Sequence, residues 1–392
     1  MEFGLFFFAN DTSSAGQVGK YDLIFEAARW ADQNGMARLW VPERHFHSFG
    51  GLSPNPSVLA AALAGVTKRI QICAGSVVLP LHDPIRVAEE WSIVDNVSGG
   101  RVGLGIASGW VPNDVVISGH QDDFRNRKEV FRERTEMLRR LWRGEPHRVT
   151  NPLGEDFDVR VMPRPVQPDL PIWITAAANP ATLREAGAMG ANVLTHLLGQ
   201  TVEDLAQKIV TYRAARAAAG HDGRGTVTLM LHTLVGDDHD EVHDLARQPM
   251  MNYLGASFDL ASRHLASVPF LKDPSRIDVT QLTPELAEAA LEASFEKYFY
   301  MGSLLGSYYK CLATVDQLAR LDVDEVACLV DFGVDPAVVM KGLENLNVLR
   351  KLANPEPLRE VQPGHQIRKS PPQSARHGLR VPGHGALCAG GS

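Results

Sequence analysis

The 392-residue chain has little cysteine, no long apolar run and no excess of positive charge. Its four cysteines, Cys73, Cys311, Cys328 and Cys388, show no CxxC spacing. This argues against a zinc ribbon or a disulfide framework and favours a reducing compartment. A membrane-spanning helix needs roughly 18 consecutive apolar residues, and none of that length occurs. The net charge of −7 provides no basic field for nucleic acid or an anionic membrane.

Several signatures of other protein classes are also missing. The start, MEFGLFFFAN, lacks the basic region and long apolar core of a signal peptide, so we expect a cytoplasmic location. No GxGxxG follows the first apolar run, which disfavours an open dinucleotide-binding sheet. There is no GxSxG motif, no carboxylate pair with acid–base spacing and no His/Asp/Glu set with metal-ligand spacing. A metal-dependent hydrolase is therefore disfavoured.

Strand-like and helix-like patterns alternate along the chain. Short β-rich apolar runs lie near residues 3, 38, 70, 102, 171, 191, 227 and 326. Helical spacing of apolar residues appears between them, at about 18–34, 56–65, 84–97, 126–142, 180–189, 202–219 and 336–351. Such alternation is typical of βα units around a parallel sheet. Eight units predict an α/β fold closed into a (β/α)8 TIM barrel, although periodicity alone does not decide closure.

Two stretches do not follow the repeat. Residues 237–311 separate the seventh strand from the last unit, are helical in part at 284–300, and are interpreted as an insertion or lid before the last strand. Residues 354–392 contain much Pro, Gly, Ser and Arg, which predicts a disordered tail. We therefore expect one barrel domain over residues 1–353.

The active site of an α/β barrel lies where its strands end, so the residues after each predicted strand are the informative ones. They are Ala9-Asn10, Pro42 to His47, Ala74-Gly75-Ser76, Ala107 to Trp110, Ala176 to Pro180, and Thr195-His196. Small residues dominate four of these six segments, which lets a flat ligand approach the backbone closely. Because catalytic side chains are few, the pattern indicates that a cofactor carries the reaction.

The segment TAAANPATLREA, residues 175–186, is typical of a strand, a small-residue turn and a helix. Asn179 suits the N-cap and Pro180 the first helical turn, so the free N–H groups there form an anion site. Thr182 can add a hydroxyl and Arg127 a positive charge. The alternative is that this turn only caps its helix.

Three longer segments carry a resemblance to a known family. They are WVPERHFHSFGGLSPNPSVLAAAL, ICAGSVVLPLHDPIRVAEEWSIVDNVSGGRVGLGIASGW and PIWITAAANPATLREAGAMGANVLTHLLGQ. In this order they resemble the luciferase-like flavin-dependent monooxygenases, above all the subgroup found beside nonribosomal peptide and polyketide assembly lines. The resemblance covers residues 1–235 and, less closely, the final barrel unit. It implies a bacterial-luciferase-like TIM barrel.

The resemblance also implies roles for single residues. His45 stands where bacterial luciferase has one of two paired active-site histidines, and its neighbour here is Arg44 instead of a second histidine. Gly75-Ser76 aligns with a non-prolyl cis peptide behind the flavin ring. Ala107 replaces a reactive cysteine and Ser108 replaces an arginine used for the flavin phosphate, which puts luminescence chemistry in doubt.

The position of a residue directly after a predicted strand and the resemblance to the family together define the predicted site. The predicted catalytic residues are His45 and His47. The predicted cofactor-binding residues are Ala9, Ala74, Gly75, Ser76, Ala107, Ser108, Arg127, Ala178, Asn179 and Thr182. The predicted substrate-binding residues are Phe8, Arg44, Trp110 and His196.

Each assignment has a structural alternative. His45 and His47 could satisfy loop carbonyls, His196 could close the barrel, and Trp110 could be a packing wedge. Glu43 and Arg44 are expected to form an ion pair, with each other or with residues behind the site, and not to be catalysts. We interpret His232, His239 and His243 as surface or insertion residues, and Cys73 as an inert core thiol.

The function that the resemblance implies is a two-component monooxygenase. FMNH2 and O2 would form a C4a-peroxyflavin that oxygenates a small or carrier-bound substrate in secondary metabolism. A separate NAD(P)H-dependent flavin reductase and a homodimer are expected. Two alternatives stay open: an F420-dependent hydride-transfer oxidoreductase, and a flavin-binding barrel without catalysis.

Overall fold

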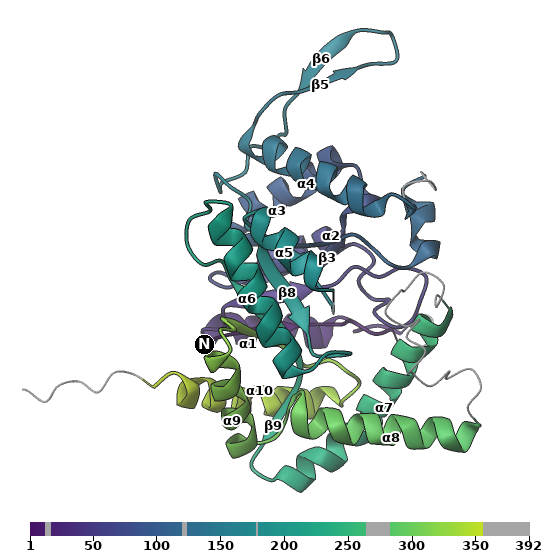
Figure 1. Ribbon diagram of the computed structural model, residues 1–392, viewed down its shortest axis with the longest axis vertical. Coiled ribbons are helices and arrows are strands. Elements are labelled where there is room, and N and C mark those ends of the chain that lie inside the picture. Colours follow the sequence, from purple (N-terminus) through teal and green to yellow (C-terminus); the bar gives the residue numbers. More distant parts are fainter. Residues whose placement is uncertain (12–16, 120–123, 178, 264–282, 356–392) are drawn as a thin grey trace, which may run out of the picture. The chain divides into compact units, whose positions relative to one another are not determined.

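The computed structural model describes residues 1–11, 17–119, 124–177, 179–263 and 283–355. Within them, eight parallel strands form a closed barrel (Figure 1). The first strand pairs with the second and with the last, and the sixth pairs with the seventh, which completes the ring. The predicted α/β barrel is confirmed, and the closure that periodicity left open is settled by these pairings.

Each barrel strand is followed by a helix. The strands are β1 (Glu2–Phe6), β2 (Arg38–Val41), β3 (Gln71–Val78), β4 (Val102–Ala107), β7 (Ile172–Thr175), β8 (Asn192–His196), β9 (Val227–Gly236) and β11 (Glu325–Leu329). The helices are α1 (Asp22–Gln33), α2 (Pro56–Val66), α3 (Pro84–Ser98), α4 (Arg127–Arg143), α5 (Pro180–Ala188), α6 (Val202–Ala218), α9 (Tyr308–Arg320) and α10 (Pro336–Ala353).

Continuous apolar sequence explains why these strands lie inside. The first nine residues of β9 and all five of β11 are buried, as expected for parallel strands covered by helices on one face and by the barrel interior on the other. Cys73, in the middle of β3, is fully buried, and burial raises the pKa of its thiol. It is the inert core thiol that the sequence predicts.

A polar network fills the barrel at the end where the strands begin. The buried Glu325 carboxylate accepts hydrogen bonds from Trp40 Nε1 at 3.2 Å, Thr228 Oγ1 at 2.7 Å and Arg38 Nη1 at 2.9 Å. The Arg38 guanidinium lies 5.3 Å from the Trp173 ring. Because these groups satisfy one another, this end is a packed floor, and the opposite end is where a ligand can enter.

The remaining elements are additions to the barrel. Between β9 and β11 the chain forms α7 (His239–Arg263), α8 (Pro284–Met301) and β10 (Leu304–Ser307), and β10 pairs with the second half of β9. Figure 1 shows α7 and α8 side by side. Short 3-10 helices η1 (Leu79–Leu81) and η2 (Pro112–Ile117) follow β3 and β4. The hairpin β5 (His147–Thr150) and β6 (Asp156–Val159), which the sequence did not predict, projects beyond α4.

Residues Met1–Asn354 make one compact unit. The predicted tail lies almost wholly outside the described residues, as do residues 264–282 of the predicted insertion. No helix of the described part is both long and apolar enough to cross a membrane.

Candidate functional site

Buried polar atoms without a partner gather where the strands end. Among the described residues there are five such atoms: Arg44 Nε after β2, Asp114 Oδ1 in η2, Thr175 Oγ1 at the end of β7, His196 Nδ1 at the end of β8 and His232 Nε2 in β9. A buried donor or acceptor left unpaired costs about 1–3 kcal/mol, so such atoms are rare in folded proteins. Their concentration at one end of the barrel indicates a surface built to bind a polar ligand.

The end of the barrel at which the strands end is called the rim below. Glu43 holds two histidines there. Its fully buried carboxylate lies 2.8 Å from His45 Nε2 and 2.6 Å from His82 Nε2, and it accepts a hydrogen bond from the Val78 N–H at 2.7 Å. Burial alone would raise the pKa of Glu43, but the hydrogen bonds from His45 and His82 lower it. The carboxylate is therefore ionised, and His45 donates through Nε2. In neutral His45 the other nitrogen, Nδ1, is then a proton acceptor.

His82 is the second imidazole on Glu43. Burial works against its charge, yet its hydrogen bond to the Glu43 carboxylate raises the pKa of His82 above the usual value. Of the two expected ion pairs, the mutual one between Glu43 and Arg44 is wrong, because Glu43 pairs with the two histidines instead.

Arg44 lies between two aromatic residues. Its guanidinium carbon is 6.0 Å from the Phe8 ring centre and 5.6 Å from the Trp110 ring centre. These residues come from the ends of β1, β2 and β4, so the structure brings together three of the four predicted substrate-binding residues.

Asp114 joins this group from η2. It contributes to the electrostatic environment of both Arg44 and His45, and burial raises the pKa of its carboxyl to about 6 against their opposing influence. A small pocket is lined by Asp114 together with Ser108, Gly109, Phe124 and Arg127. Arg127 donates to the carbonyl oxygens of Gly109 and Phe124 at 3.1 and 2.9 Å. Ser108 and Arg127, predicted to bind the cofactor, are thus neighbours across one pocket.

The predicted cis peptide is present between Gly75 and Ser76. It lies where the pairing of β3 with β4 shifts, between Ala74 and Val77. A Cβ at Gly75 would come within 2.8 Å of Phe6 and 3.3 Å of Trp40, which explains the glycine. Ala74 is fully buried, and Ala107, the last residue of β4, pairs with Val78.

A second group of polar residues at the rim includes His196 of β8 and His232 of β9. His232 is completely buried, and its Nδ1 lies 3.0 Å from the Tyr298 hydroxyl of α8. The interpretation of His232 as a surface or insertion residue is therefore wrong. Burial lowers the pKa of His196 to about 4 and that of His232 to about 3, so both are neutral at pH 7.

Helix α7 reaches the same place through Tyr253. The Tyr253 ring packs against Phe8, Phe49 and His232, with ring centres 5.3, 4.8 and 4.3 Å apart. The region between β9 and β11 therefore supplies part of the wall of the rim through Tyr253 and Tyr298.

The end of β1 is fixed by an acidic residue that sequence reasoning missed. Asp331, just after β11, accepts hydrogen bonds from the backbone N–H groups of Phe8 at 2.6 Å and Ala9 at 2.7 Å. Burial raises the pKa of Asp331 to about 6. Ala9 itself has a φ of 59°, in the left-handed region that alanine seldom adopts.

His47 is directed away from Glu43. Its Nδ1 accepts a hydrogen bond from the Phe49 N–H at 3.0 Å, and its Nε2 is 3.8 Å from Asp259 of α7. These contacts tie the turn after β2 to α7. The catalytic role of His47 stays a prediction.

The predicted phosphate turn forms as expected, although Ala178 lies outside the described residues. Asn179 is the N-cap of α5 and accepts a hydrogen bond from the Ala181 N–H at 3.0 Å, with Pro180 as the first helical residue. Thr182 is half-buried in the first turn. Within the described part of the chain, no hydrogen bond or ion pair links Asn179 or Thr182 to Glu43 or to its two histidines.

Sequence reasoning missed several residues of the rim besides Asp331, among them Glu43 as a histidine anchor, His82, Asp114, Thr175 and His232. His82 and Asp114 follow β3 and β4 by several residues, beyond the positions directly after each strand. His232 lies six residues into a ten-residue strand. A search of all polar residues in and shortly after the strands would have found them.

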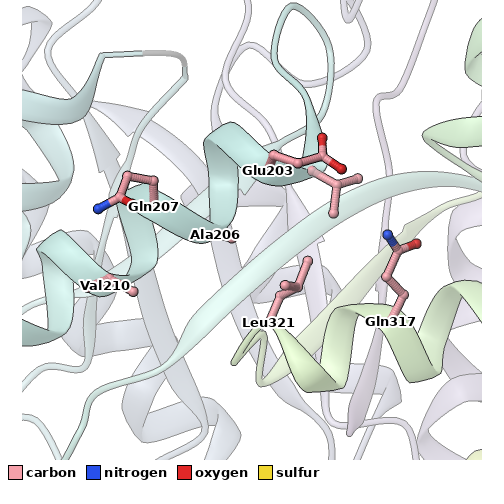
Figure 2. Close-up of a pocket in the computed structure, with 7 residues that line it drawn as sticks. Glu203, Ala206, Gln207, Val210, Gln317 and Leu321 are labelled. Atoms are coloured by element: carbon pink, nitrogen blue, oxygen red, sulfur yellow. The ribbon is translucent and has the colours of Figure 1, made fainter.

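A different groove lies on the outer surface of the barrel. Figure 2 shows it between α6 and α9, with Glu203, Ala206, Gln207 and Val210 facing Gln317 and Leu321. None of the five unpaired buried atoms belongs to it. We therefore place the candidate site at the rim.

Comparison with known proteins agrees with a barrel of this kind. The sequence profile described as luciferase-like monooxygenase matches residues 1–303. The protein belongs to the luciferase-like flavin-dependent monooxygenase family.

The proteins to which this chain is similar differ in their activities. The chain is 29% identical over 262 residues to the oxygenase component of a flavin-dependent trigonelline monooxygenase from Acinetobacter baylyi, covering 66% of this chain and 72% of that protein. It is 33% identical over 184 residues to an F420-dependent glucose-6-phosphate dehydrogenase from Amycolatopsis mediterranei, covering 45% of this chain and 54% of that protein.

Among solved structures, the fold is similar to the oxygenating constituent of 3,6-diketocamphane monooxygenase from Pseudomonas putida. This type II Baeyer–Villiger monooxygenase was solved in complex with FMN. The TM-score is 0.68 at 20% identity, covering 88% of this chain and 96% of that one. At this identity the likeness shows the shared fold.

Proposed function

We propose that this protein is the oxygenase component of a two-component monooxygenase that uses reduced FMN and O2. The substrate is a small or carrier-bound compound of secondary metabolism. The observation that carries the proposal is the set of unpaired buried polar atoms at the barrel rim, beside a histidine whose tautomer Glu43 fixes.

The rim fits a flat polar cofactor. Ala9, Ala74, Gly75, Ser76 and Ala107 would leave room for the flavin ring, because none carries a large side chain. Ser108, Arg127, Ala178, Asn179 and Thr182 would hold the phosphate, since the α5 N-terminus presents free N–H groups. A reduced flavin held there would provide the two electrons with which O2 delivers one oxygen atom to the substrate and the other to water.

The side chains of the chain itself have simpler tasks. His45 Nδ1 would accept or return a proton during the reaction, with Glu43 setting the orientation of the ring. Tyr253 and Tyr298, from α7 and α8, would exclude water from the rim, which is the role proposed for the region 237–311 as a lid.

The trigonelline enzyme is named as an oxygenase component, which supports a separate NAD(P)H-dependent flavin reductase as partner. We also propose a cytoplasmic homodimer. The similarity to an F420-dependent dehydrogenase supports the second candidate, hydride transfer with F420 and without oxygen.

Anaerobic binding followed by exposure to O2 separates these functions. Equal concentrations of reduced FMN, oxidised FMN and reduced F420 are each mixed with the protein and separated by ultrafiltration. We expect reduced FMN to be retained most strongly, and its reaction with O2 to differ in rate from that of free reduced FMN.

Retention of F420 instead of FMN would favour the dehydrogenase. A flavin-binding barrel without catalysis would hold both redox states of FMN alike and leave the rate with O2 unchanged. Either result would overturn the proposal.

A further inference from the structure

Arg44 is held firmly at the rim. Its guanidinium lies over the Phe8 and Trp110 rings, and its Nε is buried without a hydrogen-bond partner. Gly50, with a φ of 82°, leaves the space that this arrangement needs. A Cβ at Gly50 would lie 3.0 Å from Arg44 Cβ and 3.2 Å from Phe8 Cε1.

The positive charge of Arg44 has no bound counter-ion. Within the described residues it forms no ion pair, and the neighbouring Glu43 is engaged by His45 and His82. Asp114 is the carboxyl that most favours the charge of Arg44. Within the described residues the two side chains form no ion pair, and Arg44 Nε and Asp114 Oδ1 are each buried without a hydrogen-bond partner. An uncompensated cation at a largely desolvated position is costly, which favours a ligand that brings an anion.

The chemistry of the guanidinium narrows the choice of anion. Its planar fork matches the two oxygens of a carboxylate, and the rings that flank it form apolar walls suited to a flat ligand. A neutral amide offers only one acceptor and leaves the charge uncompensated.

We propose that Arg44 binds a carboxylate of the substrate, so that the substrate is a small, flat organic acid. This inference rests on the proposed function for the identity of the site, and it narrows the substrate class within it. It differs from the predicted contacts of the cofactor, because no hydrogen bond or ion pair among the described residues joins Arg44 to Asn179 or Thr182 of the phosphate turn.

Matched acid and amide probes test the proposal in flavin-free protein. Benzoate and benzamide, and nicotinate and nicotinamide, are titrated by calorimetry, with thermal melting as a second readout. We expect each acid to bind about tenfold tighter than its amide and to raise Tm, because a ligand that binds only the folded state stabilises it.

Variants at position 44 test whether the guanidinium causes the preference for acids over amides. Arg44→Met is expected to abolish the difference between acid and amide, and Arg44→Lys to retain part of it, since an ammonium cannot pair bidentately. The unliganded Arg44→Met protein should melt cooperatively at the same or a higher Tm, because an unpaired charge has been removed.

Arg29→Met is the matched control, because Arg29 lies 6.0 Å from the Phe25 ring on α1, on the outside of the barrel. It should bind the probes as the unaltered protein does. If Arg44→Met does not fold, the acid-over-amide preference of Arg44→Lys decides the matter, and an unchanged preference there overturns the proposal.

Three other outcomes would overturn it: amides that bind as well as acids, an acid preference that survives Arg44→Met, or no acid binding up to about 10 mM. A loss of reduced-FMN affinity in Arg44→Met with the acid preference intact would mean that the guanidinium serves the anionic flavin instead. Because the probes are titrated without flavin, a failure of the proposed function would leave the acid preference in place.

Discussion

Glu43 shows how one residue can order several others at the rim. Its carboxylate contacts His45, His82 and the Val78 N–H, and thereby fixes which nitrogen of His45 is engaged within the protein. The histidine could be predicted from its place after β2, because the resemblance and the rim position agree. Its anchor could not, since the contact with His82 joins residues 39 positions apart in the sequence.

The Glu43→Gln variant tests this arrangement. Glutamine keeps the size of the side chain but removes the charge, so His45 loses its fixed tautomer. We expect turnover with reduced FMN to fall on the order of 10- to 100-fold, while the Kd for reduced FMN stays within about twofold. His45→Ala should lose more turnover than Glu43→Gln, again at nearly unchanged flavin affinity.

Stopped-flow kinetics and anaerobic flavin titration measure the two quantities separately. If flavin affinity and turnover fall together in Glu43→Gln, the residue serves binding or folding and does not position His45.

At the scale of elements, the sequence predicted the strands of the barrel and missed the short strands outside it. The eight barrel strands and seven of the helices after them have apolar patterns that their surroundings require, so their positions agree with prediction within a few residues. Helix α9 is the exception, because the sequence predicted no helix between the insertion at 237–311 and the last strand. The β5–β6 hairpin escaped notice because its residues are half-buried or exposed and form no apolar run. Strand β10 is buried but only four residues long, too short to stand out within 237–311.

A buried aspartate joins α1 to the turn before β3. The Asp32 carboxylate accepts hydrogen bonds from the N–H groups of Lys68 at 3.1 Å, Arg69 at 2.6 Å and Ile70 at 2.8 Å. Burial alone would raise the pKa of Asp32, but these backbone hydrogen bonds lower it below the model-peptide value of 3.8. A lowered pKa in the folded state means that the stabilisation is present above pH 3.8 and is lost as pH falls through the folded pKa.

Asp32→Asn is therefore expected to lower the free energy of unfolding by about 2 kcal/mol near pH 7, because the amide cannot accept all three hydrogen bonds. The difference from the unaltered protein should shrink in acid, as Asp32 becomes protonated. Denaturant unfolding at pH 7 and at pH 3 measures both effects. Asp169→Asn, at an exposed position, is the control and should change stability by less than about 0.5 kcal/mol. An equal loss at both pH values would show that the charge of Asp32 is not what stabilises this contact.

At the scale of the whole barrel, the two ends differ in how their polar groups are satisfied. At the end where the strands begin, Glu325 pairs with Arg38, Trp40 and Thr228. All five unpaired buried polar atoms of the described residues lie toward the opposite end, the rim. The sequence located that second end through its small residues, because the position after a barrel strand can be counted along the chain. It could not show which polar atoms remain unpaired, because that depends on contacts between strands and on Tyr253 and Tyr298 of α7 and α8.

The structure of the protein with FMN bound tests the central claim most directly. We predict the flavin ring at the rim beside Gly75-Ser76 and His45, with the phosphate against the N-terminus of α5 at Asn179 and Thr182. FMN bound in the groove between α6 and α9, or with its phosphate far from α5, would contradict this account of the site.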